Sequence, residues 1–335
     1  MRAMTIKAFN EPWQLVEVPS PRPAAGQVVI EVHYSGVCGT DLHVHHGHFP
    51  VTAPLVAGHE PTGVIVEVGA GVLDLKVGDR VGVFWAQKGC GRCETCQSGE
   101  PAVFCASSQS WMNLGGGNSE FMLAWASGCA LIPDGLDLAA AAPLFCAGYT
   151  VMSAYRNATP RAGERVAILG VGGLGHLALQ IAKALGHETL ALTGQTGKRA
   201  ELLALGADDV IVTGDDPGKA LREAGGADVI VSTTSSAKQV GQAMAGLRRR
   251  GRLVTTGVLD GAAAIDTFDL MMRQLELRGS TQDERIDMHD ILALAAKGKV
   301  KPAIEVYPLA QANEARDRLD AGKVRYRAVL AHEPA

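Results

Sequence analysis

The sequence lacks three features that would point to particular classes of protein. It has no large excess of charge, and a formal net charge of −4 in 335 residues argues against nucleic acid or an anionic membrane as the main partner. Its most apolar stretch, 138–149, contains Pro143 and falls short of the ~20 residues that span a bilayer. The first residues lack the apolar core of a signal peptide, so we expect a soluble, cytoplasmic protein.

Cysteine, in contrast, is concentrated. Seven cysteines are present, and four of them form the pattern Cys90-x2-Cys93-x2-Cys96-x8-Cys105. In a chain without an export signal, clustered thiols more often hold metal than form disulfides. Four thiolates close a tetrahedral shell around Zn²⁺ and leave no open position for chemistry. The pattern predicts a structural zinc site, with a redox-active thiol cluster as the alternative.

The hydropathy pattern divides the chain into two domains. Short β-branched segments with glycine between them, such as 28–34 and 61–71, favour a β-rich, barrel-like domain. From about residue 161, strands alternate with helices, which predicts a doubly wound parallel sheet. The expected strands are 165–169, 189–193, 210–213, 229–233 and 253–258, and the expected helices are 174–185, 197–205 and 240–249. After Gly279, a helix at 288–297 and a strand at 327–330 indicate a return to the first domain.

A glycine-rich turn follows the first strand of the second domain. The segment matches G-x-G-x-x-G between a predicted strand and a predicted helix, through Gly170, Gly172, Gly173, Leu174 and Gly175. Glycines there permit a tight turn and let the backbone approach a pyrophosphate, whose charge the helix N-terminus stabilises. The pattern predicts a dinucleotide site. The alternative is an ordinary glycine-rich turn of an α/β protein.

The second strand of this domain does not end in the acidic residue that binds the ribose of NAD. It ends in Thr193, and Lys198 and Arg199 follow. A neutral threonine does not repel a 2′-phosphate, and the two cations could pair with one. We therefore favour NADP(H), with NAD(H) as the alternative cofactor. The two cations could instead be solvated charges in the first turn of a helix.

Three further segments carry metal-ligating residue types. They are Cys38-Gly39-Thr40-Asp41-Leu42-His43, Gly58-His59-Glu60-x2-Gly63-x5-Gly69-x2-Val72 and Phe145-Cys146. Taken singly, Cys38 or Cys146 is more often a small buried hydrophobe than a ligand. In this order, together with the four-cysteine segment and the glycine-rich turn, they resemble the zinc-dependent alcohol dehydrogenases of the medium-chain dehydrogenase/reductase superfamily. The resemblance covers essentially the whole chain.

The resemblance implies a fold, a metal content and a reaction. The fold is α/β plus β: a GroES-like catalytic domain at 1–147 and 281–335 and an inserted Rossmann domain at 148–280. A catalytic zinc held by Cys38, His59 and Cys146 brings the expected content to two zinc ions per chain. The implied enzyme interconverts primary alcohols and aldehydes by hydride transfer to or from NADP(H) or NAD(H). Family members are usually homodimers or homotetramers.

The resemblance also assigns roles to individual side chains. It implies that Asp41 orients the His59 ring, that Thr40 accepts a hydrogen bond from the alcohol, and that His43 passes a proton to solvent. Glu60 either approaches the metal or serves as a structural ion-pair partner. Two aromatic residues, Phe49 and Trp85, match substrate-pocket positions, although core packing is the alternative for each, and Arg327 matches an arginine that contacts the cofactor pyrophosphate.

Some residues depart from the family pattern. Eight residues separate Cys96 from Cys105 where seven are usual, which puts Cys105 in doubt as a ligand. Gly39 replaces a phosphate-binding side chain of several relatives. Four histidines, His43, His45, His46 and His48, form a small histidine-rich patch in the sequence. Apart from His43 they are expected as exposed loop residues, with adventitious metal binding as the alternative.

Two other functions compete with this interpretation. One is a zinc-free quinone or enone reductase on the same scaffold, which would not need the three catalytic ligands. The other is a non-catalytic nucleotide-binding protein with structural zinc only, which would not need Thr40 or His43. The enzyme hypothesis predicts two zinc ions per chain, and the non-catalytic hypothesis predicts one.

Overall fold

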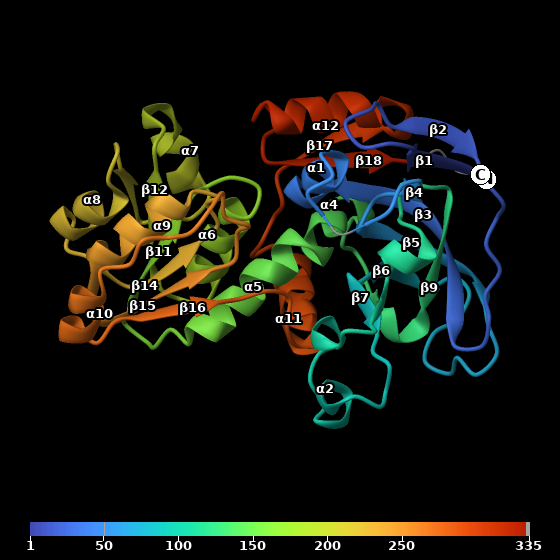
Figure 1. Cartoon of the computed structure of the whole chain (residues 1–335), viewed down its shortest axis with the longest axis horizontal. Helices are drawn as coiled ribbons and strands as arrows, with labels where there is room; N and C mark the ends of the chain where they lie inside the picture. The colour runs from blue at the N-terminus through green and yellow to red at the C-terminus, as the bar shows by residue number, and fades with distance from the viewer. Residues whose placement is uncertain (50, 333–335) are drawn as a thin grey trace. The chain divides into compact units, whose positions relative to one another are not determined.

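The structure is a computed structural model that describes residues 1–49 and 51–332. The chain forms two compact units (Figure 1). The first comprises Met1–Cys146 and the chain from Pro302 onward, and the second is Ala147–Lys301. No single helix in the described ranges is long and apolar enough to cross a membrane, although one bent pair, Leu138–Phe145 with Ala147–Ala158, passes on length and composition alone.

The first unit is built mainly of β-strands. Its strands are β1 (Arg2–Ile6), β2 (Gln14–Glu17), β3 (Gln27–Val37), β4 (Leu55–Val56), β5 (Glu60–Val68), β6 (Arg80–Val83), β7 (Ala86–Lys88), β8 (Gln109–Ser110), β9 (Phe121–Trp125), β10 (Cys129–Leu131), β17 (Ile304–Pro308) and β18 (Arg327–Ala331). Its α-helices are short: α1 (Gly39–His45), α2 (Glu94–Gln97), α3 (Trp111–Leu114), α4 (Leu138–Ala141) and α12 (Ala312–Asp320). Short 3-10 helices lie at η1 (Ala102–Phe104), η2 (Ala126–Gly128), η3 (Ala142–Phe145) and η6 (Leu309–Gln311).

A seven-stranded sheet organises this unit. Its strand order is β10-β6-β5-β3-β18-β17, with β9 also paired to β3. The long strand β3 alternates inward residues such as Val28, Ile30 and Val32, which are almost fully buried in one apolar cluster. Their spacing of two places these three side chains on one face of the strand, and Val29 on the other face is buried as well, so both faces of this part of β3 are covered. Because β18 pairs with β3, the C-terminal part of the chain completes the sheet that the N-terminal part begins.

The second unit is a parallel α/β domain. Its strands are β11 (Arg165–Leu169), β12 (Glu188–Thr193), β13 (Asp209–Val212), β14 (Ala227–Ser232), β15 (Leu247–Thr255) and β16 (Glu276–Gly279). Its helices are α5 (Ala147–Ala158), α6 (Gly175–Ala184), α7 (Arg199–Ala204), α8 (Pro217–Glu223), α9 (Ala237–Ala243), α10 (Thr267–Arg273) and α11 (Arg285–Ala296), with 3-10 turns η4 (Thr196–Lys198) and η5 (Met244–Gly246).

The six strands of this unit lie in the order β13-β12-β11-β14-β15-β16, and all neighbouring pairs are parallel. Successive residues of β11 face opposite sides of the sheet, so Ala167 and Leu169 enter the apolar cluster that also contains residues of α8 and α9. Helices α5 and α6 pack against each other and against the central strands (Figure 1). The strand order reverses between β11 and β14, where ligands of open α/β sheets bind.

The elements differ from the sequence prediction in three places: the helix expected at 240–249, the strand expected at 253–258, and the return of the chain to the first unit. The expected helix at 240–249 is shorter: α9 ends at Ala243, and β15 already begins at Leu247. The chain returns to the first unit at Pro302, whereas the sequence predicted a return at 281. Helix α11 explains this difference, because it packs on α5 and its Asp287 accepts a 2.7 Å hydrogen bond from Ser153.

Candidate functional site

Helix α1 presents the first cysteine of the dispersed group. Cys38 caps this helix: its Sγ accepts a hydrogen bond from the Thr40 N–H at 3.3 Å, and its own N–H donates to Asp41 Oδ2 at 2.9 Å. This reciprocal pair satisfies backbone donors that a helix start otherwise leaves unpaired. The cap fixes the direction of the Cys38 side chain, which is 4 % exposed.

The histidine that precedes β5 faces this cysteine. His59 is almost fully buried, and its Nε2 lies 3.3 Å from Cys38 Sγ. Its Nδ1 lies 3.4 Å from Asp41 Oδ1, and Asp41 is also fully buried. A carboxylate at one ring nitrogen fixes the tautomer and directs the lone pair of the other nitrogen toward a metal. Asp41 therefore occupies the position that the sequence analysis gave it.

The 3-10 turn η3 carries the third member of the group. Phe145 packs over Gly82, where any Cβ would lie 2.2 Å from the ring, and Cys146 follows directly. The Sγ atoms of Cys146 and Cys38 are 4.0 Å apart. One ligand atom each of Cys38, His59, Glu60 and Cys146 lies within 4.8 Å of the others.

These distances fit a zinc ion. With Zn–S bonds of about 2.3 Å, two sulfurs of a tetrahedral shell lie about 3.8 Å apart. The donor set of two thiols and one imidazole, with its other ring nitrogen facing a carboxylate, suits zinc by ligand chemistry as well. The buried residues thus already form a shell of the right size and composition.

The electrostatics of the group favour a thiolate at Cys38. Its pKa lies well below the ordinary value because the Cys146 thiol donates a hydrogen bond to it, and His59 adds to this effect against the cost of burial. The pKa of Cys146 is raised well above its usual value, because this thiol donates to Cys38 and because it is buried. Burial acts to lower the pKa of His59, but the charges of Asp41 and Cys38 raise it well above its ordinary value. Such a set gives up protons when a metal binds.

A buried ion pair lies beside the group. Glu60 and Arg327 are almost fully buried, and the Arg327 guanidinium donates to Glu60 Oε1. Burial raises the pKa of Glu60 to about 7, although Arg327 opposes this shift. The carboxylate fits only because residue 36 is glycine, where a Cβ would lie 1.9 Å from Glu60 Oε2. Arg327, predicted from the resemblance to contact the cofactor, is engaged by Glu60 in this structure.

Aromatic rings enclose His59. The ring centroid of Trp85 lies 5.1 Å from that of His59, and Phe49 lies 5.5 Å from Trp85. Trp85 therefore lies beside His59, and Phe49 lies beside Trp85. Both rings also pack against the apolar core of this unit, so their role in a substrate pocket stays a prediction. Trp111, which the sequence analysis missed, lies 6.0 Å from His59 and 5.4 Å from Trp85. Its position in a short loop helix, α3, gave no periodic signal in the sequence.

The two predicted proton-handling residues both lie on α1. Thr40 is in the first turn, next to Cys38, and His43 is partly exposed in the last turn. The helix therefore places Thr40 beside Cys38 and His43 near solvent, as transfer of a proton from the site to solvent would require. Their roles stay predictions.

The four-cysteine segment forms a second compact group. Cys90, Cys93, Cys96 and Cys105 offer sulfurs that all lie within 4.8 Å of one another, and Cys93 and Cys105 are 3.7 Å apart. The eight-residue spacing thus does not keep Cys105 away from the other three. Backbone N–H groups of Arg92 and Cys93 lower the pKa of Cys90 to about 6, which favours its thiolate. The distances and donors fit a four-sulfur zinc shell.

The glycine-rich turn of the second unit connects β11 to α6. Gly170 has a φ of +84°, which favours glycine, and a Cβ on Gly175 would lie 2.1 Å from the Gly170 carbonyl oxygen. A Cβ on Gly172 would meet no atom within 4 Å, so the backbone there is open to a ligand. Gly173 and Leu174 complete the turn at the start of α6. The turn has the shape that a pyrophosphate needs at a helix N-terminus.

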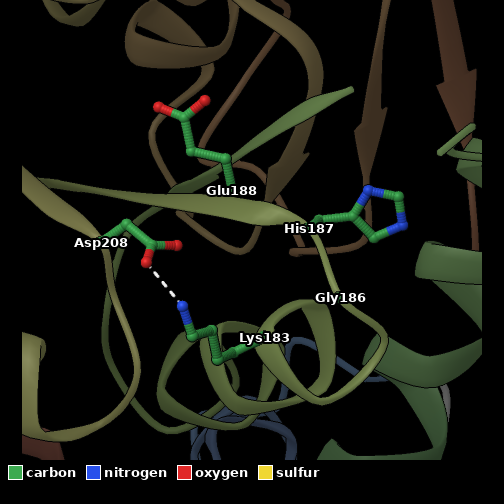
Figure 2. Close-up of a pocket in the computed structure, with 5 residues that line it drawn as sticks. All are labelled: Lys183, Gly186, His187, Glu188 and Asp208. Carbon is green, nitrogen blue, oxygen red and sulfur yellow. Dashed lines mark hydrogen bonds and ion pairs between the residues drawn. The ribbon is translucent and has the colours of Figure 1, made fainter. Parts of the chain in front are cut away.

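A surface hollow of ≈ 360 Å³ lies elsewhere in this unit, at the amino ends of β12 and β13 (Figure 2). Figure 2 shows Lys183 Nζ paired with Asp208 across it, at 2.5 Å. Parallel strands place their amino and carboxyl ends at opposite edges of a sheet, and nucleotides bind at the carboxyl edge. The hollow is therefore not the dinucleotide site.

The end of β12 carries the residues predicted to select the cofactor. Thr193 is buried, and its Oγ1 accepts a hydrogen bond from the Gln195 N–H at 3.2 Å. Arg199 is exposed, and its guanidinium donates to Asp209 at 2.8 Å and to the Val210 carbonyl at 2.7 Å. Lys198 lies in the turn η4, between Thr193 and α7.

Comparison with known proteins agrees with both units. Residues 24–134 match the family model of the alcohol dehydrogenase GroES-like domain, and residues 173–297 match that of the zinc-binding dehydrogenases. An alcohol dehydrogenase of Geobacillus stearothermophilus is 38% identical over 98% of this chain and 98% of its own. The crystal structure of the alcohol dehydrogenase from Aeropyrum pernix is 31% identical with a TM-score of 0.90, covering 99% of this chain and 100% of that one.

One further neighbour, titled an NAD-dependent alcohol dehydrogenase, is 27% identical with a TM-score of 0.90, covering 99% of each chain. The predicted fold class, a GroES-like domain plus a Rossmann domain, and the predicted oxidoreductase class are confirmed. Neither the zinc-free reductase nor the non-catalytic protein is favoured. The chain belongs to the zinc-dependent alcohol dehydrogenases of the medium-chain dehydrogenase/reductase superfamily.

Proposed function

We propose that this enzyme interconverts primary alcohols and aldehydes at the group formed by Cys38, His59 and Cys146. The observation that carries this proposal is the convergence of three ligands from distant segments, with Asp41 behind the histidine. A set used only for structure would be expected to offer a closed shell of four strong ligands. Here the fourth neighbour is Glu60, which is already engaged by Arg327.

Residues around Cys38, His59 and Cys146 hold these side chains in position and shape the approach to them. Zinc held there would act as a Lewis acid that favours the deprotonated form of a bound alcohol. Asp41 keeps the His59 ring oriented, and the α1 cap keeps Cys38 in place. The rings of Phe49 and Trp85 narrow the approach to His59 and favour unbranched or aromatic primary alcohols.

Proton transfer falls to residues of α1. The Thr40 hydroxyl accepts the hydrogen bond of the alcohol, and His43 takes up the proton and releases it to solvent. The support for these roles is the family resemblance and the position of both residues on one helix. A His43→Ala variant should oxidise alcohol more slowly and should recover with added imidazole, whereas a His289→Ala variant on α11 should behave like the wild type.

The cofactor proposal is NADP(H) in preference to NAD(H), bound at the glycine-rich turn. A bound nicotinamide dinucleotide supplies or accepts the hydride. A neutral Thr193 and a nearby Lys198 favour a 2′-phosphate, while Arg199 would have to leave Asp209 in order to contribute. Comparing kcat/KM for the two cofactors tests the preference. Thr193→Asp should shift it toward NADH, and a wild type that prefers NADH would refute it.

Two zinc ions per chain form part of the same proposal. The buried group takes the catalytic ion, and the four sulfurs of Cys90, Cys93, Cys96 and Cys105 take a structural one. No nucleic-acid or membrane partner is proposed, and we propose a cytoplasmic location, where thiols stay reduced.

A homodimer or homotetramer is the proposed assembly. Strand β16 is the outer strand of its sheet, and the neighbouring helix α10 exposes the apolar residues Phe268, Met271 and Met272. Exposed apolar side chains beside a sheet edge are typical of an interface. Light scattering coupled to size exclusion measures the mass, and a monomer would refute this part.

A substrate panel tests the function as a whole. Primary, secondary, allylic and aromatic alcohols should be assayed with both cofactors, with His59→Ala and Cys129→Ala as the variant pair. Cys129 is a buried cysteine that belongs to neither candidate metal group. We expect turnover of primary alcohols by wild type and Cys129→Ala, and loss of turnover but retained dinucleotide binding in His59→Ala. Unchanged kcat in His59→Ala would refute the proposed site.

A further inference from the structure

A cluster of histidine side chains lies at the carboxyl end of α1, outside the buried group. The rings follow one another in space: the centroids of His43 and His48 are 6.2 Å apart, those of His48 and His46 are 5.7 Å apart, and those of His46 and His45 are 5.0 Å apart. His48 is exposed and His46 is partly exposed. The sequence already places these histidines in one short segment, and the structure brings their rings close together.

Two contacts of His46 place an acceptor at each of its ring nitrogens. Its Nδ1 lies 3.1 Å from Asn10 Oδ1, which accepts a hydrogen bond in the tautomer that carries its proton on Nδ1. The Nε2 atom then holds the lone pair, and it faces Asp320 Oδ2 at 3.8 Å. Two ligand atoms on one tetrahedral zinc lie about 3.4 Å apart, since each Zn–N or Zn–O bond is about 2.1 Å. The distance between His46 Nε2 and Asp320 Oδ2 is therefore close to the distance between two ligand atoms of one zinc ion.

His48 can supply a third ligand. Two imidazoles that share a zinc ion have ring centres within about 6.5 Å, because each bonded nitrogen lies about 2.1 Å from the metal. The separation of 5.7 Å between His46 and His48 is inside this limit. The ligand atoms of His46, His48 and Asp320 do not all lie within 4.8 Å of one another in the structure, so His48 must rotate toward the other two to bind the same ion. Its exposed side chain can do so without breaking core packing.

The backbone beneath these side chains is held in place. The Asn10 N–H donates to the His45 carbonyl at 2.7 Å, and the His48 N–H donates to the His43 carbonyl at 2.8 Å. The prediction of an exposed loop residue is wrong for His45, which lies in the last turn of α1 and is buried against Trp13. The frame thus fixes both the metal-facing histidine and the amide that orients it, as neighbours of metal ligands do in known sites.

We propose that His46 Nε2, His48 and Asp320 form an accessory site for a divalent transition-metal ion, with Asn10 orienting His46. The ring of His43 lies 6.2 Å from His48, so an ion here would place positive charge beside the residue assigned to proton transfer. A bound ion should therefore slow alcohol oxidation. This consequence rests on the proposed function, whereas the binding itself does not.

Calorimetric titration of the zinc-loaded full-length enzyme with Ni²⁺ tests the site. We expect one Ni²⁺ per chain in the wild type, and affinity at least tenfold weaker in His46→Ala, His48→Ala and Asp320→Asn. Asn10→Ala should lose about tenfold, as expected when a group that orients a ligand is removed. The matched control is His289→Ala, because His289 Nδ1 also lies near an aspartate, 3.5 Å from Asp290 Oδ1, but on an exposed helix face.

The outcomes separate the site from the activity. Binding that persists unchanged in His46→Ala and His48→Ala, or that is lost in His289→Ala, would overturn the accessory site. Ni²⁺ should also inhibit alcohol oxidation in the wild type and much less in His48→Ala. Binding at this site without inhibition would support the site and count against His43 as the proton acceptor, and an enzyme that oxidises no alcohol would refute the proposed function while the titration still decides the site.

Discussion

The two cysteine groups of the first unit differ in how the chain builds them. Cys90, Cys93, Cys96 and Cys105 come from one loop, and three of them are partly exposed. The ligands of the other group come from α1, from the start of β5 and from the end of η3, and each is placed by contacts with other elements. We therefore expect the loop group to depend on a bound metal for its shape more than the dispersed group, whose ligands are held by several elements of the fold.

The loop that carries Cys90, Cys93, Cys96 and Cys105 lies between two paired strands, β7 and β8. Trp85 and Trp111 flank these two strands in the sequence. The loop can therefore change while the aromatic residues around His59 keep their support. Metal in the loop should act on local stability, and metal in the dispersed group should act on chemistry.

The largest expected effect is on turnover in Cys146→Ser. Replacing one sulfur of the open shell should lower kcat by about a thousandfold or more, because the Lewis acid is lost or misplaced. Dinucleotide binding, measured by cofactor fluorescence, should stay close to wild type. Cys129→Ser, at a buried cysteine outside both groups, is the control. A wild-type kcat in Cys146→Ser would contradict the claim that the dispersed group, and not the loop group, performs the chemistry.

A smaller effect is expected from the residue behind His59. Asp41→Asn keeps the size of the side chain but removes its charge, and loss of such an orienting partner costs about 10- to 100-fold in metal affinity. Competition with a chromophoric chelator measures this affinity. The zinc held by the loop cysteines should keep its affinity, and equal weakening of both ions would show that Asp41 acts on the whole unit instead.

A buried histidine outside both cysteine groups, His332, should make the stability of the first unit depend on pH. Burial lowers the pKa of His332 to about 4, in a setting that also includes Glu120, His33 and Arg2. The unfolded chain, with a histidine pKa of about 6.5, then binds more protons than the folded one between about pH 4 and 6.5, so stability falls as pH falls through this window.

Removing this histidine should abolish its contribution to the acid sensitivity. Between pH 8 and pH 5, the free energy of unfolding should fall by about 2 kcal/mol less in His332→Phe than in the wild type. Urea unfolding at the two pH values measures this difference. Identical pH dependence of wild type and variant would mean that His332 stays uncharged in both states or finds a partner on protonation.

The smallest effect on activity is expected in the loop. Cys96→Ser should release one zinc ion and make the segment more sensitive to limited proteolysis, while kcat changes by less than about threefold, because separate sites act almost independently. A loss of kcat as large as that of Cys146→Ser would show that the loop supports the chemistry through the β7–β8 pair.

The sequence predicted the loop group well because all of its ligands lie close together in the chain. The alternation of strands and helices likewise predicted the parallel sheet. The strand expected at 253–258 begins earlier, at Leu247, because the three arginines at 248–250 hid the first part of β15 from a search for apolar residues. The dispersed group could be predicted only by resemblance, since no local spacing connects Cys38, His59 and Cys146. The sequence shows the histidines around His46 as neighbours and allows an ion-pair role for Glu60. Their partners, Asp320 and Arg327, and the ring of Trp111 beside His59 depend on tertiary packing, so no pattern along the chain could indicate them.

Zinc content tests the central claim most directly. Metal analysis of the purified wild type should give two zinc ions per chain. Cys38→Ser should retain one zinc ion and lose turnover, and Cys96→Ser should retain one zinc ion and keep turnover. One zinc ion in the wild type, or full turnover in a Cys38→Ser enzyme that retains a single ion, would contradict the account.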